Sequence, residues 1–217
     1  MTFSEYIVNF NIIQFGNFTL KSGRKSPYFF NFGLFNNGEM IDKLGEYYAD
    51  TIVEANIDFD IVYGSAYKGI PIALSTVMAL KTKYGINKGY TFNRKEEKKH
   101  GDKGVYVGSD LTNKKVLSVD DVLTSGKTTV ETKKFIDKNG GQLVASLVAL
   151  NRGEQYFNNS NYSAEVGLKN QYNIDILSIA NINDVLETLN NNKMVEEFKK
   201  LDSYINCLLY TSPSPRD

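Results

Sequence analysis

VLSVDDVLTSGKT, residues 116–128, combines an apolar β-branched segment, two adjacent carboxylates and a run of small residues. The apolar segment predicts a buried strand that delivers Asp120 and Asp121 to its carboxyl end. Thr124 to Thr128 then predict a loop that opens a helix and presents backbone N–H groups and hydroxyls to a phosphate. Because adjacent acids can hold ribose hydroxyls or a magnesium-bound sugar, this segment predicts a site for a phosphorylated ribose.

Two other interpretations of this segment are weaker. Ser-Gly-Lys-Thr suggests a P-loop, but that motif needs a glycine five residues before Gly126, where this chain has Asp121. An ordinary strand, turn and helix cap would account for one acid, but not for two acids followed by Thr-Ser-Gly-Lys-Thr. We therefore favour the phosphoribose site.

The chain on either side alternates between predicted strands and helices. Apolar strands that alternate with helices predict an α/β fold whose parallel sheet is covered on both faces. Ligands of such sheets bind at the carboxyl ends of the strands, here after Tyr63, Asn93, Val119 and Leu150. The predicted strands are 60–64, 89–93, 115–119, 143–150 and 174–179, and the predicted helices are 70–84, 128–139, 183–190 and 195–205.

The N-terminal segment predicts a small cover over this sheet. Apolar residues from Phe3 to Ile13 have helical spacing, which predicts a helix that ends before Gly16. Aromatic runs at 18–20 and 28–35 predict an antiparallel pair, and a helix is predicted from Met40 to Ala55. We expect one domain over residues 1–206, with the cover formed by about 1–36. Residues 207–217 are expected to be disordered, and their composition resembles a translated adaptor.

Composition excludes several classes of function. The 217 residues suit one α/β domain, and 25 basic against 25 acidic residues give zero net charge. Nucleic-acid binding normally shows as a basic excess, and no apolar run is long enough for a membrane span or a signal peptide. The single Cys207 cannot form an internal disulfide, and with the single His100 it provides no zinc cluster. We expect a cytoplasmic protein without a nucleic-acid or membrane partner.

Four segments together resemble a known family. Residues 116–128 look like the phosphoribosyl-pyrophosphate (PRPP) signature of the type I phosphoribosyltransferases. FTLKSGRKSPYFFN at 18–31, GSAYKGIP at 64–71 and FNRKEEKKHG at 92–101 are similar to the orotate phosphoribosyltransferase family, in the family's order. The resemblance implies a central, mainly parallel sheet flanked by helices with an N-terminal hood. It also implies transfer of the 5-phosphoribosyl group from PRPP to orotate, giving orotidine 5′-monophosphate and pyrophosphate in pyrimidine biosynthesis.

The resemblance also implies residue roles around PRPP. Asp120 and Asp121 would hold the ribose hydroxyls, residues 124–128 would cradle the 5′-phosphate, and Lys68 would meet the diphosphate. The weaker alternative for Lys68 is a solvent-facing lysine at a helix start. Magnesium would be bound mainly through PRPP near the two acids, without a dedicated protein cage. The implied catalytic residues are Lys68, Lys98, His100, Asp120 and Asp121, and the PRPP site adds Lys21, Tyr67, Arg94, Lys95, Val122, Leu123, Thr124, Ser125, Gly126, Lys127 and Thr128.

Residues 94–108 resemble the family's mobile catalytic loop. Arg94, Lys95, Lys98 and His100 would close over pyrophosphate, and the loop would reach the neighbouring subunit's site. On charge alone, the run is typical of a solvated surface loop. The resemblance therefore implies a homodimer with shared sites and a loop that is mobile while the site is empty.

Base recognition is expected to involve a cation and flat apolar surfaces. Arg152 can pair bidentately with the orotate carboxylate. By resemblance, Phe29 and Phe30 line the base pocket, Thr124 adjoins the base and Lys21 bridges base and PRPP. Without the resemblance, Phe29 and Phe30 would be assigned to the core. The alternatives are a phosphoribosyltransferase for another base and a PRPP-binding regulator without turnover.

Overall fold

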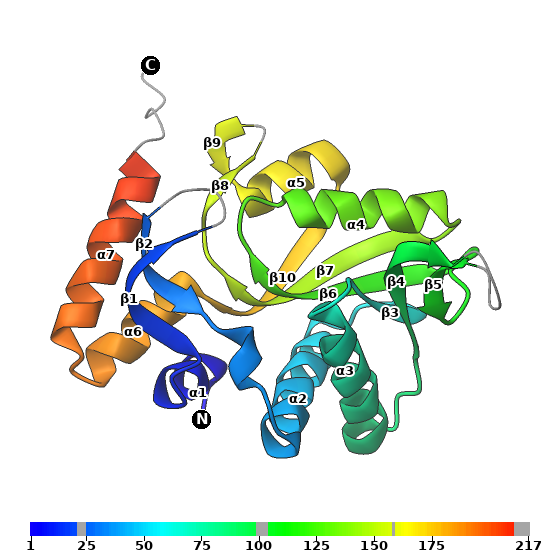
Figure 1. Cartoon of the computed structure of the whole chain (residues 1–217), viewed down its shortest axis with the longest axis horizontal. Helices are drawn as coiled ribbons and strands as arrows, with labels where there is room; N and C mark the ends of the chain where they lie inside the picture. The colour runs from blue at the N-terminus through cyan, green and yellow to red at the C-terminus, as the bar shows by residue number, and fades with distance from the viewer. Residues whose placement is uncertain (21–24, 99–103, 158, 211–217) are drawn as a thin grey trace.

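A mainly parallel sheet forms the centre of the protein (Figure 1). The computed structural model describes residues 1–20, 25–98, 104–157 and 159–210. In these ranges the sheet has six strands in the order β10-β7-β6-β3-β4-β5, and only β4 and β5 pair antiparallel. The predicted α/β class is confirmed. The strands are β3 (Ile61–Gly64), β4 (Gly89–Lys98), β5 (Gly104–Gly108), β6 (Lys115–Leu123), β7 (Gln142–Asn151) and β10 (Asp175–Asn181).

Helices cover both faces of the sheet. α2 (Gly38–Ala55) and α3 (Gly69–Tyr84) lie on one face, and α4 (Lys127–Lys138) and α5 (Ala164–Tyr172) lie on the other (Figure 1). Successive side chains of a strand point to opposite faces. Val62 therefore joins the core under α2 and α3, whereas Ile61 and Tyr63 join the core under α4 and α5. Burial of each such side chain contributes roughly 1.5–3 kcal/mol, which is why β3 is apolar throughout.

The N-terminal segment forms the hood, residues 1–36. It contains α1 (Phe3–Asn9), the antiparallel strands β1 (Ile13–Thr19) and β2 (Lys25–Phe30), and the short helix η1 (Phe32–Leu34). α6 (Ile182–Asn191) contacts α1, and α7 (Val195–Tyr210) contacts β2. The N-terminal hood therefore packs against the last two helices of the described chain.

The predicted N-terminal helix is too long. Thr2 and Glu5 form a capping box that starts α1, but the helix ends at Asn9. Asn11 has a left-handed φ of 55°, which turns the chain, and Ile13 begins β1 instead. Ile13 is buried in the strand as it would be in a helix, so its apolar character does not separate the two structures.

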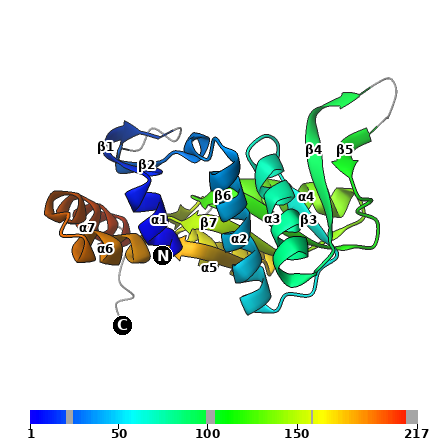
Figure 2. The same ribbon diagram turned by 90° about the horizontal axis from the view of Figure 1, so that it is seen from below.

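A second difference lies at the sheet edge. β4 continues to Lys98 and pairs with β5, so Arg94, Lys95 and Lys98 lie on a strand and not in the predicted loop. This hairpin projects beyond the body of the molecule (Figure 2). The run from Arg94 to Lys98 is charged throughout, so its sequence lacks the apolar alternation that indicates a strand. Residues 99–103 of the predicted loop, including His100, lie outside the described residues.

Other differences concern element ends and short elements. β6 runs to Leu123, so Asp120 and Asp121 lie within the strand and not after it. α7 runs to Tyr210, so the predicted disorder from Cys207 is wrong for 207–210, and 211–217 lie outside the described residues. The sequence analysis also missed α5 and the hairpin of β8 (Gln155–Tyr156) and β9 (Asn159–Ser163). The single-domain organisation of 1–206 stays a prediction.

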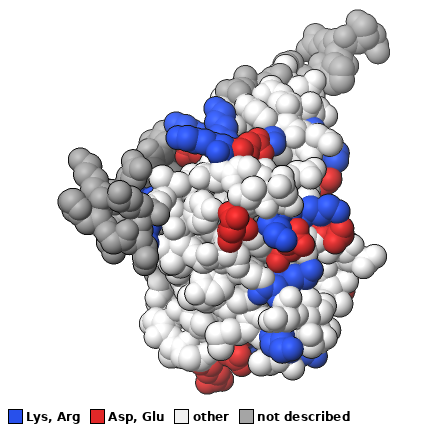
Figure 3. Space-filling view, turned by 90° about the vertical axis from the view of Figure 1, so that its right-hand side faces the viewer, with Lys and Arg blue, Asp and Glu red and all other residues white. Residues whose placement is uncertain are grey.

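The face shown in Figure 3 carries no large patch of a single charge. Basic and acidic side chains are interspersed there among uncharged residues. Among the helices of the described ranges, none combines the length and the apolar character that a bilayer crossing requires.

Close backbone contact fixes the turn between β3 and α3. A Cβ built on Gly64 would lie 1.9 Å from the carbonyl oxygen of Gly69, and one on Gly69 would lie 2.6 Å from the carbonyl carbon of Gly64. No side chain fits at either position. The approach holds residues 65–68 over the carboxyl end of β3.

We predict that Gly64→Ala destabilises the protein. The added methyl group must displace backbone, and overpacking of this kind costs about 1–3 kcal/mol, or roughly 3–10 °C in Tm. Gly38→Ala is the matched control, because a Cβ on Gly38 meets nothing within 4 Å. Thermal unfolding of both variants checks the prediction, and an unchanged Tm for Gly64→Ala would contradict it.

Candidate active site

A cavity of about 710 Å³ opens at the carboxyl ends of β6 and β7, beside the hood. It brings together residues predicted for PRPP and for the base from four separate segments. Among the predicted residues it is lined by Phe29, Phe30, Lys68, Asp120, Asp121, Val122, Thr124, Ser125, Thr128 and Arg152. The sequence analysis missed Gln14, Phe18, Thr19, Leu20 and Glu154, which also line it. Glu154 could have been predicted from its position two residues after Arg152, close to the end of a predicted strand.

The two carboxylates are held by the backbone and by one lysine. Asp121 Oδ2 accepts a hydrogen bond from Lys68 Nζ at 2.6 Å, and Asp121 Oδ1 accepts one from the Val122 N–H at 3.0 Å. Asp120 Oδ1 accepts from the Asp121 N–H at 2.9 Å. The buried hydroxyl of Tyr48 donates to the Asp120 carbonyl at 2.6 Å and so ties α2 to this part of β6. Lys68 therefore lines the cavity and pairs with Asp121, while its side chain remains 55% exposed.

Asp120 has a raised pKa. Burial, and then the negative charge of Asp121, raise the pKa of Asp120 to about 7. Near neutral pH Asp120 therefore retains a proton in a large fraction of the molecules. A protonated carboxyl can donate a hydrogen bond as well as accept one, which suits the vicinal hydroxyls of a ribose.

The loop after β6 places unpaired N–H groups beside the acids. Gly126 has a left-handed φ of 85° and is followed by the first residue of α4, Lys127. No side chain caps this helix start, so the first-turn N–H groups of α4 are available to an anion. Ser125 and Thr128 line the cavity. The Leu123 side chain is buried in the core and does not line it.

The segment carrying Tyr67 and Lys68 contacts the first part of β4. The Ala66 N–H donates to Asn93 Oδ1 at 2.8 Å, and Lys95 Nζ lies 4.4 Å from the centre of the Tyr67 ring. The Ala66–Tyr67 peptide is cis. Arg94 adjoins these contacts on β4, and neither Arg94, Lys95 nor Tyr67 lines the cavity. Lys21 and His100 lie outside the described residues, as does the Lys98 side chain.

The base end of the cavity is bounded by aromatic rings and by Arg152. Phe29 is 39% exposed, while Phe30 is buried in the main core and still lines the cavity. Arg152 is 4% exposed, and its Nε lies 2.8 Å from Glu154 Oε1. Burial by itself lowers the pKa of Arg152, but nearby Tyr28 and Glu154 outweigh this effect and raise it, so the guanidinium stays charged.

Comparison with known proteins places this site in a family. A family model described as the phosphoribosyl transferase domain matches residues 33–179. Orotate phosphoribosyltransferase of Haemophilus influenzae (strain PittGG) is 47% identical over 85% of both chains. The Hamiltonella defensa protein of the same name is 43% identical over 93% of this chain and 92% of its own. The chain belongs to the orotate phosphoribosyltransferase family.

A solved structure agrees with this membership. Orotate phosphoribosyltransferase of Francisella tularensis matches with a TM-score of 0.80 and 37% identity, covering 93% of this chain and 96% of its own. The type I phosphoribosyltransferase fold predicted from the resemblance is thereby confirmed.

In this member of the orotate phosphoribosyltransferase family, we predict that Asp120→Asn stabilises the protein in a pH-dependent way. From about pH 4 to about pH 7 the unfolded carboxyl is ionised while the folded one is protonated. The folded state then binds more protons, so stability falls as pH rises through this window. Asparagine removes that loss, and its advantage should grow with pH to an upper bound of about 4 kcal/mol.

Thermal unfolding at a series of pH values measures this difference. The exposed Asp42→Asn on α2 serves as the control. A Tm difference between wild type and Asp120→Asn that stays constant from pH 4 to pH 8 would contradict the raised pKa.

Proposed function

We propose that the protein transfers the 5-phosphoribosyl group from PRPP to orotate, giving orotidine 5′-monophosphate and pyrophosphate in pyrimidine biosynthesis. The observation that carries this proposal is the single cavity shared by the acid pair on β6, the start of α4 and Arg152. It provides groups for a ribose, for a phosphate and for a carboxylated base at one place. The names of the relatives point to the same reaction.

The chemistry follows from how the charges are arranged. The bond from the ribose carbon to pyrophosphate breaks with its electrons leaving on pyrophosphate, and a bond to the orotate nitrogen forms on the opposite face. The proton of that nitrogen is lost to pyrophosphate or to water. The ribose carbon passes through a cationic, oxocarbenium-like state, so no nucleophilic side chain is required. Asp120 and Asp121 would hold the ribose hydroxyls, and residues 124–128 the 5′-phosphate. Lys68 would exchange its contact with Asp121 for the departing diphosphate.

We propose that magnesium enters with PRPP. Mg²⁺ supplies charge neutralisation to the diphosphate when bound. In the described part of the chain, no group of three or more His, Cys, Asp and Glu side chains is arranged for a metal. Asp121 is paired with Lys68 and Asp120 retains a proton near neutral pH, so the two acids suit a hydrated, substrate-borne ion.

We predict that orotate is consumed with PRPP and Mg²⁺, whereas uracil and hypoxanthine are not. Arg152→Lys keeps a cation beside Glu154 but loses the planar fork, so the KM for orotate should rise about 10-fold to 100-fold with the KM for PRPP unchanged. A spectrophotometric assay of orotate consumption provides both constants. Preference for another base, binding of PRPP without turnover, or equal weakening of both substrates would refute the corresponding assignment.

We further propose a cytoplasmic homodimer with shared sites. The described strands of the β4–β5 hairpin project away from the rest of the subunit (Figure 2), which favours contact of this hairpin with a second copy. In this arrangement Lys98 and His100 would serve the partner's site, whereas Arg94 and Lys95 lie near their own Tyr67 segment on β4. The single cysteine, which cannot form an internal disulfide, supports the cytoplasmic location.

A mixture of two inactive variants tests the shared site. After subunit exchange between Lys98→Ala and Asp121→Asn, a mixed dimer holds one site with intact acids and an intact hairpin. About a quarter of wild-type activity should return if exchange is random. Each variant exchanged with itself is the control. Absence of recovery despite demonstrated exchange would place the hairpin over its own subunit's site.

A further inference from the structure

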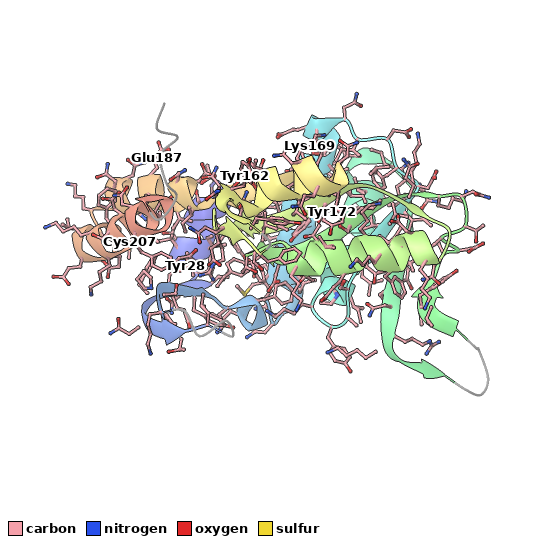
Figure 4. The ribbon with its side chains drawn as sticks, turned by 90° about the horizontal axis from the view of Figure 1, so that it is seen from above. Tyr28, Tyr162, Lys169, Tyr172, Glu187 and Cys207 are labelled. Carbon is pink, nitrogen blue, oxygen red and sulfur yellow. The ribbon has the colours of Figure 1, made fainter. Side chains whose placement is uncertain are left out.

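The guanidinium of Arg152 is constrained by contacts on three sides. Glu154 Oε1 lies 2.8 Å from its Nε, and Nη2 donates to Ser26 Oγ at 3.3 Å. Its carbon lies 4.4 Å from the centre of the Tyr28 ring, which covers one face of the plane. Tyr28 lies where the hood meets α7 (Figure 4), and its ring contacts that of Tyr204 edge-on. Position, direction and plane of the cation are therefore all fixed.

The partner carboxylate is itself held in place. Glu154 is 6% exposed and lies between β7 and β8, where its carbonyl accepts a hydrogen bond from the Ala164 N–H at 2.8 Å. Burial of an ion pair is costly, and apolar residues of similar size often serve stability as well or better. Both members of this pair line the cavity. The cost of burying this pair falls in the wall of the cavity, so recognition of a substrate explains the pair better than protein stability does.

The contact of Nε with Glu154 determines which edge of the guanidinium remains available to a ligand. Arginine has one donor on Nε and four on the terminal nitrogens. With Nε held in the ion pair 2.8 Å from Glu154 Oε1, the terminal nitrogens carry the donors that can meet a planar carboxylate from the cavity. Without Glu154, the group could turn and present another edge, and a bidentate pair tolerates little misdirection.

We propose that Glu154 is a positioning residue that directs Arg152 toward the carboxylate of orotate. The inference rests on the proposed function. Glu154 acts on the carboxylated base alone and leaves the PRPP groups unaffected. Its carboxylate performs this role through the buried ion pair between Oε1 and Arg152 Nε.

Binding of two nucleotides that differ in one group tests the proposal. Orotidine 5′-monophosphate carries the carboxylate and uridine 5′-monophosphate lacks it, and calorimetry gives both dissociation constants. Glu154→Ala should weaken the first about 10-fold or more and leave the second unchanged. Glu154→Gln keeps the size of the side chain but removes the charge of the ion pair, so it should weaken the first nucleotide selectively as well. Equal weakening of both nucleotides by Glu154→Ala, no weakening, or a Glu154→Gln variant that binds like wild type would overturn the proposal.

Two controls accompany this test. Glu165→Ala removes a carboxylate that binds Asn151 Nδ2 at 2.9 Å, beside Arg152, and should change neither constant. If Glu154→Ala does not fold, Glu154→Asp replaces it. The shorter side chain keeps the charge but withdraws the carboxylate from Arg152 Nε. The same selective loss is then expected, and its absence overturns the proposal.

The outcome for Arg152→Lys separates this inference from the proposed function. If wild type does not prefer the carboxylated nucleotide, the proposed function fails. If the preference exists and Arg152→Lys reduces it while Glu154→Ala does not, only the role of Glu154 fails.

Discussion

β6 is buried on both faces, and this constraint determines where the protein can hold charge. Its apolar residues alternate between the core under α2 and α3 and the core under α4 and α5, so a charged side chain along its length would have no solvent. Charged residues of β6 therefore lie toward its ends, with the exposed Lys115 at the amino end. Asp120 and Asp121 lie toward the carboxyl end, beside Lys68 from the turn after the neighbouring β3. The site follows from the sheet that isolates it.

Charge compensation recurs at both ends of the cavity. At the carboxyl end of β6, Lys68 neutralises Asp121 while Asp120 retains a proton near neutral pH. After β7, Glu154 neutralises Arg152. Each pair lowers the cost of holding an ion in a partly buried cavity, and each leaves one member able to interact with an incoming substrate. An empty site of this kind is prepared for an anionic base and a polyanionic sugar without carrying a large net charge.

The surroundings of Arg152 are assembled from distant segments. Ser26 and Tyr28 come from β2, Arg152 follows β7, and Tyr204 comes from α7. Local sequence links none of these three segments to the others. Their convergence explains why the described C-terminal helix packs on the hood, since its aromatic ring supports the ring on which Arg152 rests.

The sequence by itself determined the alternating strands and helices, the acids followed by a small-residue loop, and the segments shared with the family, because these are local patterns with fixed periods or spacings. Only the tertiary structure revealed the projecting β4–β5 hairpin, the pairing of Glu154 with Arg152, and the burial that raises the pKa of Asp120. Each of these depends on what lies across space from a residue. A charged run such as 94–98 is compatible with a loop or with a strand, and its pairing with β5 decides between them. The pKa of a carboxylate depends on neighbours in space that can lie far away in the sequence.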